Sequence, residues 1–283
     1  MTTGLSLHVG LNKVDPAKYG GWDGELVACE NDANDMARLA RAAGFKDTTV
    51  LTRDGTVENI TAELRKAADK LADGDILLFT YSGHGGQVVN LDGAEDEPDE
   101  FDETLVFFDR EFLDDELYRE FGRFADGVRI LAFLDCCHSG SAIEVRELLS
   151  PEAMEQQFQT REPSEIENTS RLMPVLKQHE IYERDKEFYQ GLQRELRQEK
   201  GRKEPASGLL ISACQDNQLA SDGPVNGKFT ETLLEVWDRG AFKGGYRDFH
   251  RDILRRMPAT QSPNFYTAGR PGDAFLGQRP FTV

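Results

Sequence analysis

Two apolar runs that each end in a short polar motif constrain this chain more than any other feature. Ile76 to Thr80 leads into Tyr81-Ser82-Gly83-His84-Gly85-Gly86, and Val128 to Leu134 leads into Asp135-Cys136-Cys137-His138-Ser139-Gly140. Such runs are typical of buried strands, and open α/β folds build their sites at the carboxyl ends of strands. We therefore expect a histidine and a cysteine to meet at one edge of a sheet.

A thiol beside an imidazole has a defined chemical use. The imidazole activates the thiol as a nucleophile and can later protonate a leaving amine, so cleavage of a peptide bond is the natural reaction. Side chains two apart project to the same face of a strand, which groups Ser82 with His84 and Asp135 with Cys137. Cys136 then points to the covered side, and we interpret it as a small buried apolar residue.

The order of predicted elements indicates an α/β fold with a mostly parallel central sheet and helices on both faces. Besides the two motif strands, we expect strands at Leu5–Leu11, Thr48–Thr52, Thr104–Phe108 and Leu209–Ala213. Helices are expected at Asp32–Ala43, which Gly44 ends, Val57–Leu71, which Thr56 caps, Asp114–Phe121, Phe229–Trp237 and Tyr246–Arg256.

Bulk properties fit a soluble intracellular enzyme. The 283 residues allow one large domain, and no run approaches the ~20 apolar residues of a membrane span. The first residues do not resemble a signal peptide, and four cysteines, two of them adjacent, do not resemble a disulfide framework. A net charge of -18 argues against binding nucleic acid. We expect a cytoplasmic protein.

Much of the negative charge lies in one stretch, with thirteen acidic residues against the single Arg110 between Asp92 and Glu116. A solvated loop is the more common meaning of such a cluster. An EF-hand is excluded because Glu97 stands where the loop needs glycine, but a discontinuous cation site remains open. The Cys-Cys-His run matches no zinc spacing, and the Cys-x-x-Cys of a redox motif is absent.

The motifs around His84 and Cys137 resemble those of the metacaspases, caspase-like cysteine peptidases of the legumain/gingipain clan. The similarity extends upstream to Cys29-Glu30-Asn31-Asp32-Ala33 and downstream to Ile211-Ser212-Ala213-Cys214-Gln215-Asp216 and Gly227-Lys228-Phe229-Thr230. It covers most of the chain except a charged middle stretch. The resemblance implies a caspase-like fold and a catalytic dyad of His84 and Cys137, with no third member.

We expect a cysteine endopeptidase in which Cys137 attacks the carbonyl and the backbone N–H groups of Gly85 and Cys137 stabilise the oxyanion. The resemblance places a specificity pocket at Cys29, Asp32, Ser82 and Asp135. Acidic groups there favour substrates with arginine or lysine at the cleavage site. Two alternatives stay open: a catalytically silent or ligand-gated signalling scaffold, and a caspase-like protease that cuts after aspartate.

The resemblance also implies a possible activator, Ca²⁺, because metacaspases that use calcium carry acidic ligands at matching positions. These are Asp102, Asp114 and Asp115, to which we add Glu144, seven residues after Cys137. Hard oxygen donors suit calcium. No organic cofactor is expected.

We expect one catalytic domain over residues 1–283, with a large-subunit-like part at 1–145, a charged helical insertion at 146–207 and a small-subunit-like part at 208–283. In the insertion, Ile181, Phe188, Leu192 and Leu196 recur at helical spacing, which predicts an amphipathic helix. An insertion that starts at the catalytic edge is expected to act as a packed lid or to be cut by the enzyme at a basic residue. Oligomeric state stays open.

Overall fold

The computed structural model describes residues 2–89, 101–137, 170–199, 207–214, 220–269 and 271–283. Its centre is a six-stranded sheet in the order β2-β1-β3-β7-β8-β9. All neighbouring pairs are parallel except β8 and β9, which are antiparallel. The strands are β1 (Gly4–Gly10), β2 (Lys46–Leu51), β3 (Ile76–Ser82), β7 (Arg129–Asp135), β8 (Ser207–Ser212) and β9 (Asn264–Ala268).

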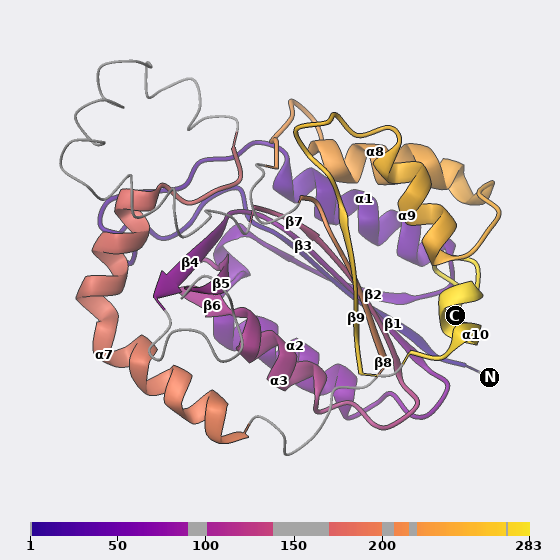
Figure 1. Ribbon diagram of the computed structural model, residues 1–283, viewed down its shortest axis with the longest axis horizontal. Coiled ribbons are helices and arrows are strands. Elements are labelled where there is room, and N and C mark those ends of the chain that lie inside the picture. The colour runs from indigo at the N-terminus through magenta and orange to yellow at the C-terminus, as the bar shows by residue number, and fades with distance from the viewer. Residues whose placement is uncertain (1, 90–100, 138–169, 200–206, 215–219, 270) are drawn as a thin grey trace.

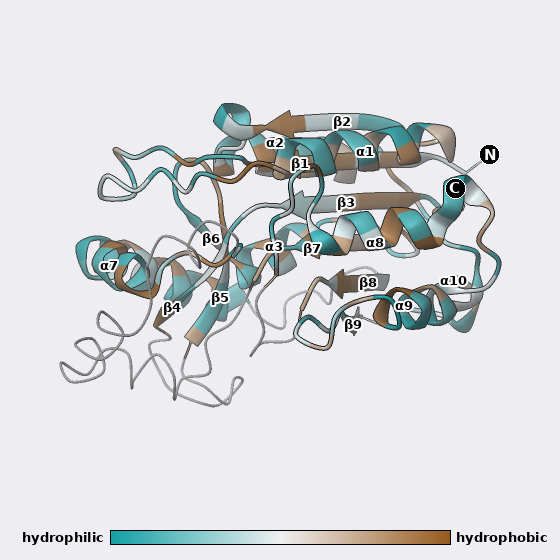
Figure 2. Ribbon diagram, turned by 90° about the horizontal axis from the view of Figure 1, so that it is seen from above, coloured by the Kyte–Doolittle hydropathy of each residue, from teal (hydrophilic) through white to brown (hydrophobic). Residues whose placement is uncertain are grey.

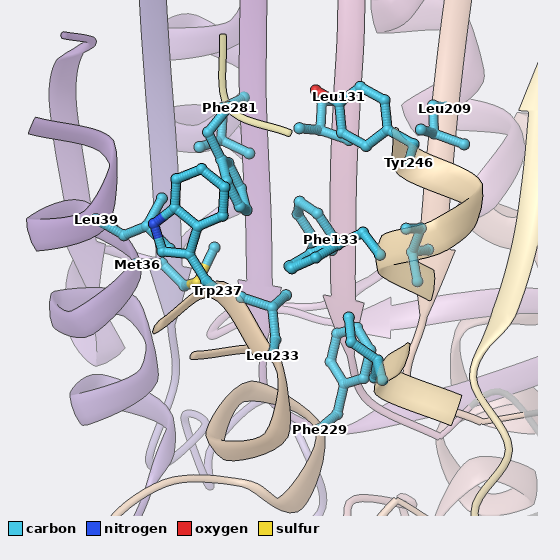
Figure 3. Close-up of a cluster of buried hydrophobic side chains, with 14 of the residues drawn as sticks. Met36, Leu39, Leu131, Phe133, Leu209, Phe229, Leu233, Trp237, Tyr246 and Phe281 are labelled. Carbon is cyan, nitrogen blue, oxygen red and sulfur yellow. The ribbon is translucent and has the colours of Figure 1, made fainter. Parts of the chain in front are cut away.

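Helices cover both faces of this sheet (Figures 1 and 2). One face carries α1 (Cys29–Ala42), α8 (Lys228–Trp237), α9 (Tyr246–Leu254) and α10 (Asp273–Gly277), and the other carries α2 (Val57–Ala68) and α3 (Asp114–Phe121). Short 3-10 helices span Thr52–Asp54 and Asp238–Gly240. Each face has its own apolar core, and Figure 3 shows the one in which Trp237, Phe133 and Phe281 pack between the sheet and the helices.

A second, antiparallel sheet lies beside the carboxyl edge of the first. It consists of β4 (Gly85–Val89), β5 (Phe101–Val106) and β6 (Glu111–Leu113), in that order. The long helix α7 (Val175–Glu199) packs along this small sheet and also contacts α3, on the side of the molecule away from α8 and α9 (Figure 1). No helix in the described portion of the chain is long and apolar enough to cross a membrane.

Local sequence signals explain where two of the helices begin or end. The Thr56 hydroxyl accepts a hydrogen bond from Asn59 N (3.3 Å) and so caps α2. Gly44 follows α1 with φ +98, a conformation that disfavours any side chain, and Phe45 N then donates to Ala40 O (3.0 Å).

The predicted fold class is confirmed, and α3 has the predicted bounds. Strands β4, β6 and β9 were not predicted, because short or half-exposed strands lack a long apolar run. The predicted helical stripe in the insertion is wrong at Phe188, which is 49% exposed, whereas Tyr189 is buried. The buried row of α7 follows Tyr182, Tyr189 and Leu196, which are seven residues apart, and Phe188 stands beside this row on the exposed side.

The two motifs meet because β3 and β7 are parallel neighbours. Ser82 pairs directly with Asp135 at the ends of these strands, so His84 and Cys137 leave the sheet at the same edge. Tyr81 holds the turn at His84, since its hydroxyl lies within hydrogen-bond distance of two carbonyl oxygens, His84 O (2.7 Å) and Val106 O (2.9 Å), which share its single hydrogen. The expected juxtaposition of the histidine and cysteine motifs results from this register.

Candidate active site

Cys137 and Cys136 lie on opposite faces of the sheet. Cys136 belongs to the core beneath α2 and α3, and burial raises its pKa well above the usual range. Cys137 belongs to the opposite face, where Ala220 N donates to its Sγ (2.7 Å). The two neighbouring cysteines therefore point to opposite faces of the sheet, as the strand alternation predicts.

His84 is buried with one ring nitrogen engaged. Its Nε2 lies 3.1 Å from Gly24 O, and because a carbonyl only accepts, Nε2 carries the hydrogen. Nδ1 has no partner among the described residues and so keeps a bare lone pair. Trp22 packs against the ring at 4.9 Å between centroids. Gly24 O thus orients the imidazole, and the sequence did not predict this contact.

Burial lowers the pKa of His84 to about 4, against the opposing effect of the hydrogen bond to Gly24. The Arg171 guanidinium nearby lowers it further, while Asp222 raises it. The imidazole is therefore neutral at pH 7, which is the protonation state that a proton acceptor needs.

A buried arginine of the chain itself, Arg171, fills the pocket beside these two residues. Its Nη2 lies 2.7 Å from Asp32 Oδ2 and 2.9 Å from Asp222 Oδ1, and all three side chains are almost completely buried. Its Nη1 donates to Ser82 Oγ (2.8 Å) and to Asp135 O (3.0 Å). The nearby Asp135 Oδ1, 2.9 Å from Nη1, completes the charge balance without an aligned hydrogen bond.

The pocket carboxylates are held in place by other donors. Asp32 accepts from Gly227 N (3.0 Å) and Asn226 Nδ2 (2.9 Å), and Asp135 accepts from both the backbone and the hydroxyl of Thr230. Burial raises the pKa of Asp135 to about 6 although Arg171 opposes this shift. Buried carboxylates need a cation close by to be stable, and here the Arg171 guanidinium provides it.

The carbonyl oxygen of Arg171 is the acceptor of two convergent backbone donors. Gly85 N lies 2.9 Å from it and Cys137 N lies 3.3 Å from it. A side chain at Gly85 would collide with the Cys137 carbonyl, so only glycine allows the two strand ends to approach this closely. These two N–H groups are the pair that the sequence analysis named for the oxyanion.

The remaining pocket candidate, Cys29, is fully buried at the start of α1. Burial raises its pKa to about 12, which Arg171 and the hydrogen bond with Ser82 oppose. Its thiol is therefore neutral and lines the pocket without adding charge. Together with Asp32, Ser82 and Asp135, it lies around the Arg171 side chain.

Three of the four proposed calcium ligands lie within the described residues. Asp102 is buried on β5 and accepts from Gln193 Nε2 of α7 (2.8 Å), while Asp114 and Asp115 begin α3. Glu144 lies outside the described residues. Within the part of the chain that the structure describes, no three His, Cys, Asp or Glu residues form a group that could hold a metal ion.

Sequence reasoning missed three contributors to the site. Gly24 acts through a backbone carbonyl, which leaves no trace in the sequence. Asp222 lies in the loop after β8. Its Oδ2 accepts a hydrogen bond from Val27 N (2.9 Å), which belongs to a distant segment of the chain. Arg171 was not singled out from the other basic residues of the insertion, because nothing in the sequence distinguishes a buried arginine from an exposed one.

A thiol, an imidazole with one free nitrogen, and two backbone donors aimed at a carbonyl oxygen form the arrangement of a cysteine peptidase site on an α/β sheet. The family model described as "Caspase domain" matches residues 14–275. The chain therefore belongs to the caspase domain family.

The relatives it resembles carry the name metacaspase, which confirms the resemblance drawn from the motifs. Metacaspase-1 of Mycosarcoma maydis is 36% identical over 154 residues, which cover 50% of this chain and 36% of the relative. Metacaspase-1 of Coccidioides immitis is 28% identical, over 81% of this chain and 52% of the relative. The chain thus spans about half the length of the curated relatives it matches, or less.

Solved structures agree on the fold. The crystal structure of a protein from Geobacter sulfurreducens is 46% identical, with a TM-score of 0.82 over 99% of both chains. Caspase-1 from Spodoptera frugiperda is 13% identical, with a TM-score of 0.55 over 94% of this chain and 86% of that one. At that identity the second match supports the fold alone.

Proposed function

We propose that this protein is a cysteine endopeptidase that cleaves after arginine or lysine through His84 and Cys137. The observation that carries the proposal is the placement of Arg171. Its guanidinium lies among the carboxylates of Asp32, Asp135 and Asp222, while its carbonyl oxygen accepts from Gly85 N and Cys137 N. The residue occupies the position that the residue before a scissile bond would take.

The chemistry results from this placement. The Cys137 thiol attacks the carbonyl carbon of the basic residue, and His84 Nδ1, the free ring nitrogen, receives the thiol proton. The oxygen gains negative charge between the N–H groups of Gly85 and Cys137, which are already directed at it. His84 then protonates the leaving amine, and water hydrolyses the thioester.

The pocket also supports the choice of substrate. Arginine offers a planar fork that pairs with several carboxylates at once, whereas a lysine ammonium is a single point charge. We therefore expect arginine to be preferred over lysine. An aspartate side chain would be repelled by three carboxylates, which argues against a caspase-like preference for aspartate.

A positional peptide library with a fluorogenic leaving group tests the proposal, with Cys137→Ala as the control for contaminating proteases. Cleavage after Arg and Lys that depends on Cys137 is the expected result, and Asp32→Ala should lower kcat/KM for arginine substrates because it removes one of the carboxylates that pair with the guanidinium. Efficient cleavage after Asp or apolar residues would overturn the specificity. An arginyl acyloxymethyl ketone should label Cys137 in a folded variant whose pocket Arg171 no longer fills. Failure to label it would favour the catalytically silent signalling scaffold.

Calcium activation is a separate proposal. It is supported by the acidic stretch around Asp102, Asp114 and Asp115 and by the preference of calcium for oxygen ligands. No step of the mechanism above requires the ion. Isothermal titration calorimetry of the wild type against Asp114→Asn, with activity measured in calcium and in chelator, tests this proposal. Heat of binding that the substitution removes is expected, and no binding together with unchanged activity would defeat it.

A further inference from the structure

Gly227 packs directly against the guanidinium that fills the pocket. A β-carbon built on Gly227 would stand 2.5 Å from each of three atoms of Arg171: Cζ, Nη1 and Nη2. Three equal distances of this length are possible only above the plane of the guanidinium, so the flat face of the group lies against Gly227. Non-bonded heavy atoms prefer to be about 3.5–4.0 Å apart, and the guanidinium therefore leaves no room for a methyl group.

The backbone at residue 227 does not itself require glycine. Gly227 precedes α8 with φ -60 and ψ 149, a conformation that other residues adopt without strain. Its N–H donates to both oxygens of Asp32, at 3.0 Å to Oδ1 and 3.2 Å to Oδ2, and every residue except proline would keep this donor. What glycine contributes at this position is therefore the space that a side chain would fill.

The guanidinium cannot move away from residue 227 without losing its partners. Its Nη2 lies 2.7 Å from Asp32 Oδ2 and 2.9 Å from Asp222 Oδ1, while its Nη1 donates to Ser82 Oγ (2.8 Å). None of the side-chain surface of Arg171 is exposed. A displaced guanidinium would stay buried with broken hydrogen bonds, which is costly for a charged group.

A lysine side chain needs less space at this point. Lysine has as many bonds between Cβ and Nζ as arginine has between Cβ and Cζ, so an extended lysine ends where the arginine Cζ lies and leaves both Nη positions empty. Its ammonium is a point charge that can shift between carboxylates, whereas the arginine fork is rigid and pairs with two of them at once. A methyl group at residue 227 would exclude the guanidinium and still admit the ammonium.

We propose that Gly227 determines the preference of the pocket for arginine over lysine, because its missing side chain leaves room for the flat face of a guanidinium. This inference rests on the proposed function and goes further by naming the residue that sets the choice between the two basic side chains. Gly227 contacts the pocket side chain and not the reacting carbonyl, so it should change the choice of substrate and not the chemical step.

The substitution Gly227→Ala tests the inference because it adds one methyl group at the point of contact. Two fluorogenic peptides that differ only in Arg or Lys at the cleavage site give the ratio of the two kcat/KM values. This ratio does not depend on how strongly Arg171 competes for the pocket, since competition lowers both values equally. Gly227→Ala should reduce the arginine-to-lysine ratio by about tenfold or more relative to wild type.

Gly272→Ala is the matched control. Gly272 also precedes a helix, α10, with φ -68 and ψ 154. A β-carbon there would meet none of the described residues within 4 Å, its own chain neighbours aside. The two substitutions make the same change at the same helix position, so Gly272→Ala should leave the arginine-to-lysine ratio unchanged.

A second measurement tests the contact without peptide cleavage, because the chain carries its own guanidinium in the pocket. Thermal unfolding is followed for Gly227→Ala with arginine at position 171 and with Arg171→Lys, each against its parent, and all four proteins carry Cys137→Ala so that no cleavage alters them. Gly227→Ala should lower the Tm by several degrees when residue 171 is arginine and by clearly less when it is lysine. Circular dichroism checks that each protein is folded.

The outcomes separate this inference from the proposed function. If both peptides are cleaved through Cys137 and Gly227→Ala leaves their ratio at the wild-type value, the inference is wrong while the proposed function stands. If the wild type cleaves neither peptide, the proposed function fails. Equal losses of Tm with arginine and with lysine at position 171 would show that the added methyl group does not collide with the guanidinium, which overturns the inference without any use of activity.

Discussion

Neighbouring cysteines differ in role because of the strand on which they lie. Cys136 packs into the core beneath α2 and α3, whereas Cys137 faces the site and gives its N–H to the Arg171 carbonyl. Both residues are cysteines, so the difference in their surroundings arises only from the alternation of side chains at the end of β7.

We predict that Cys137→Ala abolishes peptidase activity, by roughly a thousandfold or more, because it removes the nucleophile. Cys136→Ala should keep most of the activity, since it removes only one buried sulfur atom. Rates of peptide cleavage by both variants, with thermal unfolding as a check of folding, test this. Activity that survives Cys137→Ala would assign the nucleophile to another residue.

Asp222 is the pocket carboxylate that only the structure reveals. We predict that Asp222→Asn lowers kcat/KM for arginine substrates about 10-fold to 100-fold, because a charge-assisted hydrogen bond to the guanidinium is lost. The effect should appear mainly in KM, since Asp222 does not touch the reacting carbonyl. Exposed Asp238 provides the control in Asp238→Asn, and equal effects of both changes would contradict the role of Asp222.

At the scale of elements, α7 joins the insertion to the site through its contacts with the small sheet. Glu111 of β6 is buried near this interface, with Thr104 Oγ1 at 3.5 Å and with Asp185 and Tyr189 of α7 nearby. Burial raises the pKa of Glu111 to about 8. The folded protein thus holds a proton that the unfolded chain releases above pH 4.5.

This contribution to stability is fully present below about pH 4.5 and is lost as the pH rises through about 8. We predict that Glu111→Gln, which keeps the size and stays neutral, unfolds at a higher temperature than wild type at pH 8 and at a similar temperature at pH 4.5. Thermal unfolding monitored by circular dichroism at both pH values measures this. A difference that does not change with pH would show that Glu111 is not protonated in the folded protein.

At the scale of the whole molecule, segments from every part of the chain meet at one edge of the central sheet. The pocket takes Asp32 from α1, Asp135 from β7 and Asp222 from the loop after β8. Strand β8 pairs with β7, so the carboxyl-terminal part of the chain extends the sheet that the amino-terminal part begins. A change in global stability should therefore affect the pocket and the dyad together.

Two buried histidines lower the free energy of unfolding at acid pH. Burial lowers the pKa of His8 to about 3 and that of His84 to about 4, so both are neutral in the folded protein and bind protons only when it unfolds. Their stability contribution is present above pH 6.5 and falls by about 1.4 kcal/mol per histidine and pH unit as the pH drops below this value.

We predict that His8→Asn, which removes one of the two side chains that bind a proton on unfolding, reduces the loss of unfolding free energy between pH 6.5 and pH 5 by about 2 kcal/mol relative to wild type. Urea unfolding at both pH values measures it. His179→Asn, a substitution of an exposed histidine, should give no such change. If the unfolding free energies of His8→Asn and wild type fall by the same amount between the two pH values, the role of His8 is contradicted.

The sequence by itself determined the fold class, the two motif strands, α3 and the position of His84 and Cys137 at one edge of the sheet, because apolar runs and their polar ends are local signals. It also indicated an acidic pocket, since Asp32 and Asp135 stand beside recognisable motifs. Only the tertiary structure decided that Asp222 and Gly24 O join the site and that Arg171 fills the pocket. These contacts link residues far apart in the chain, and they depend on burial and backbone direction, which a linear pattern does not encode.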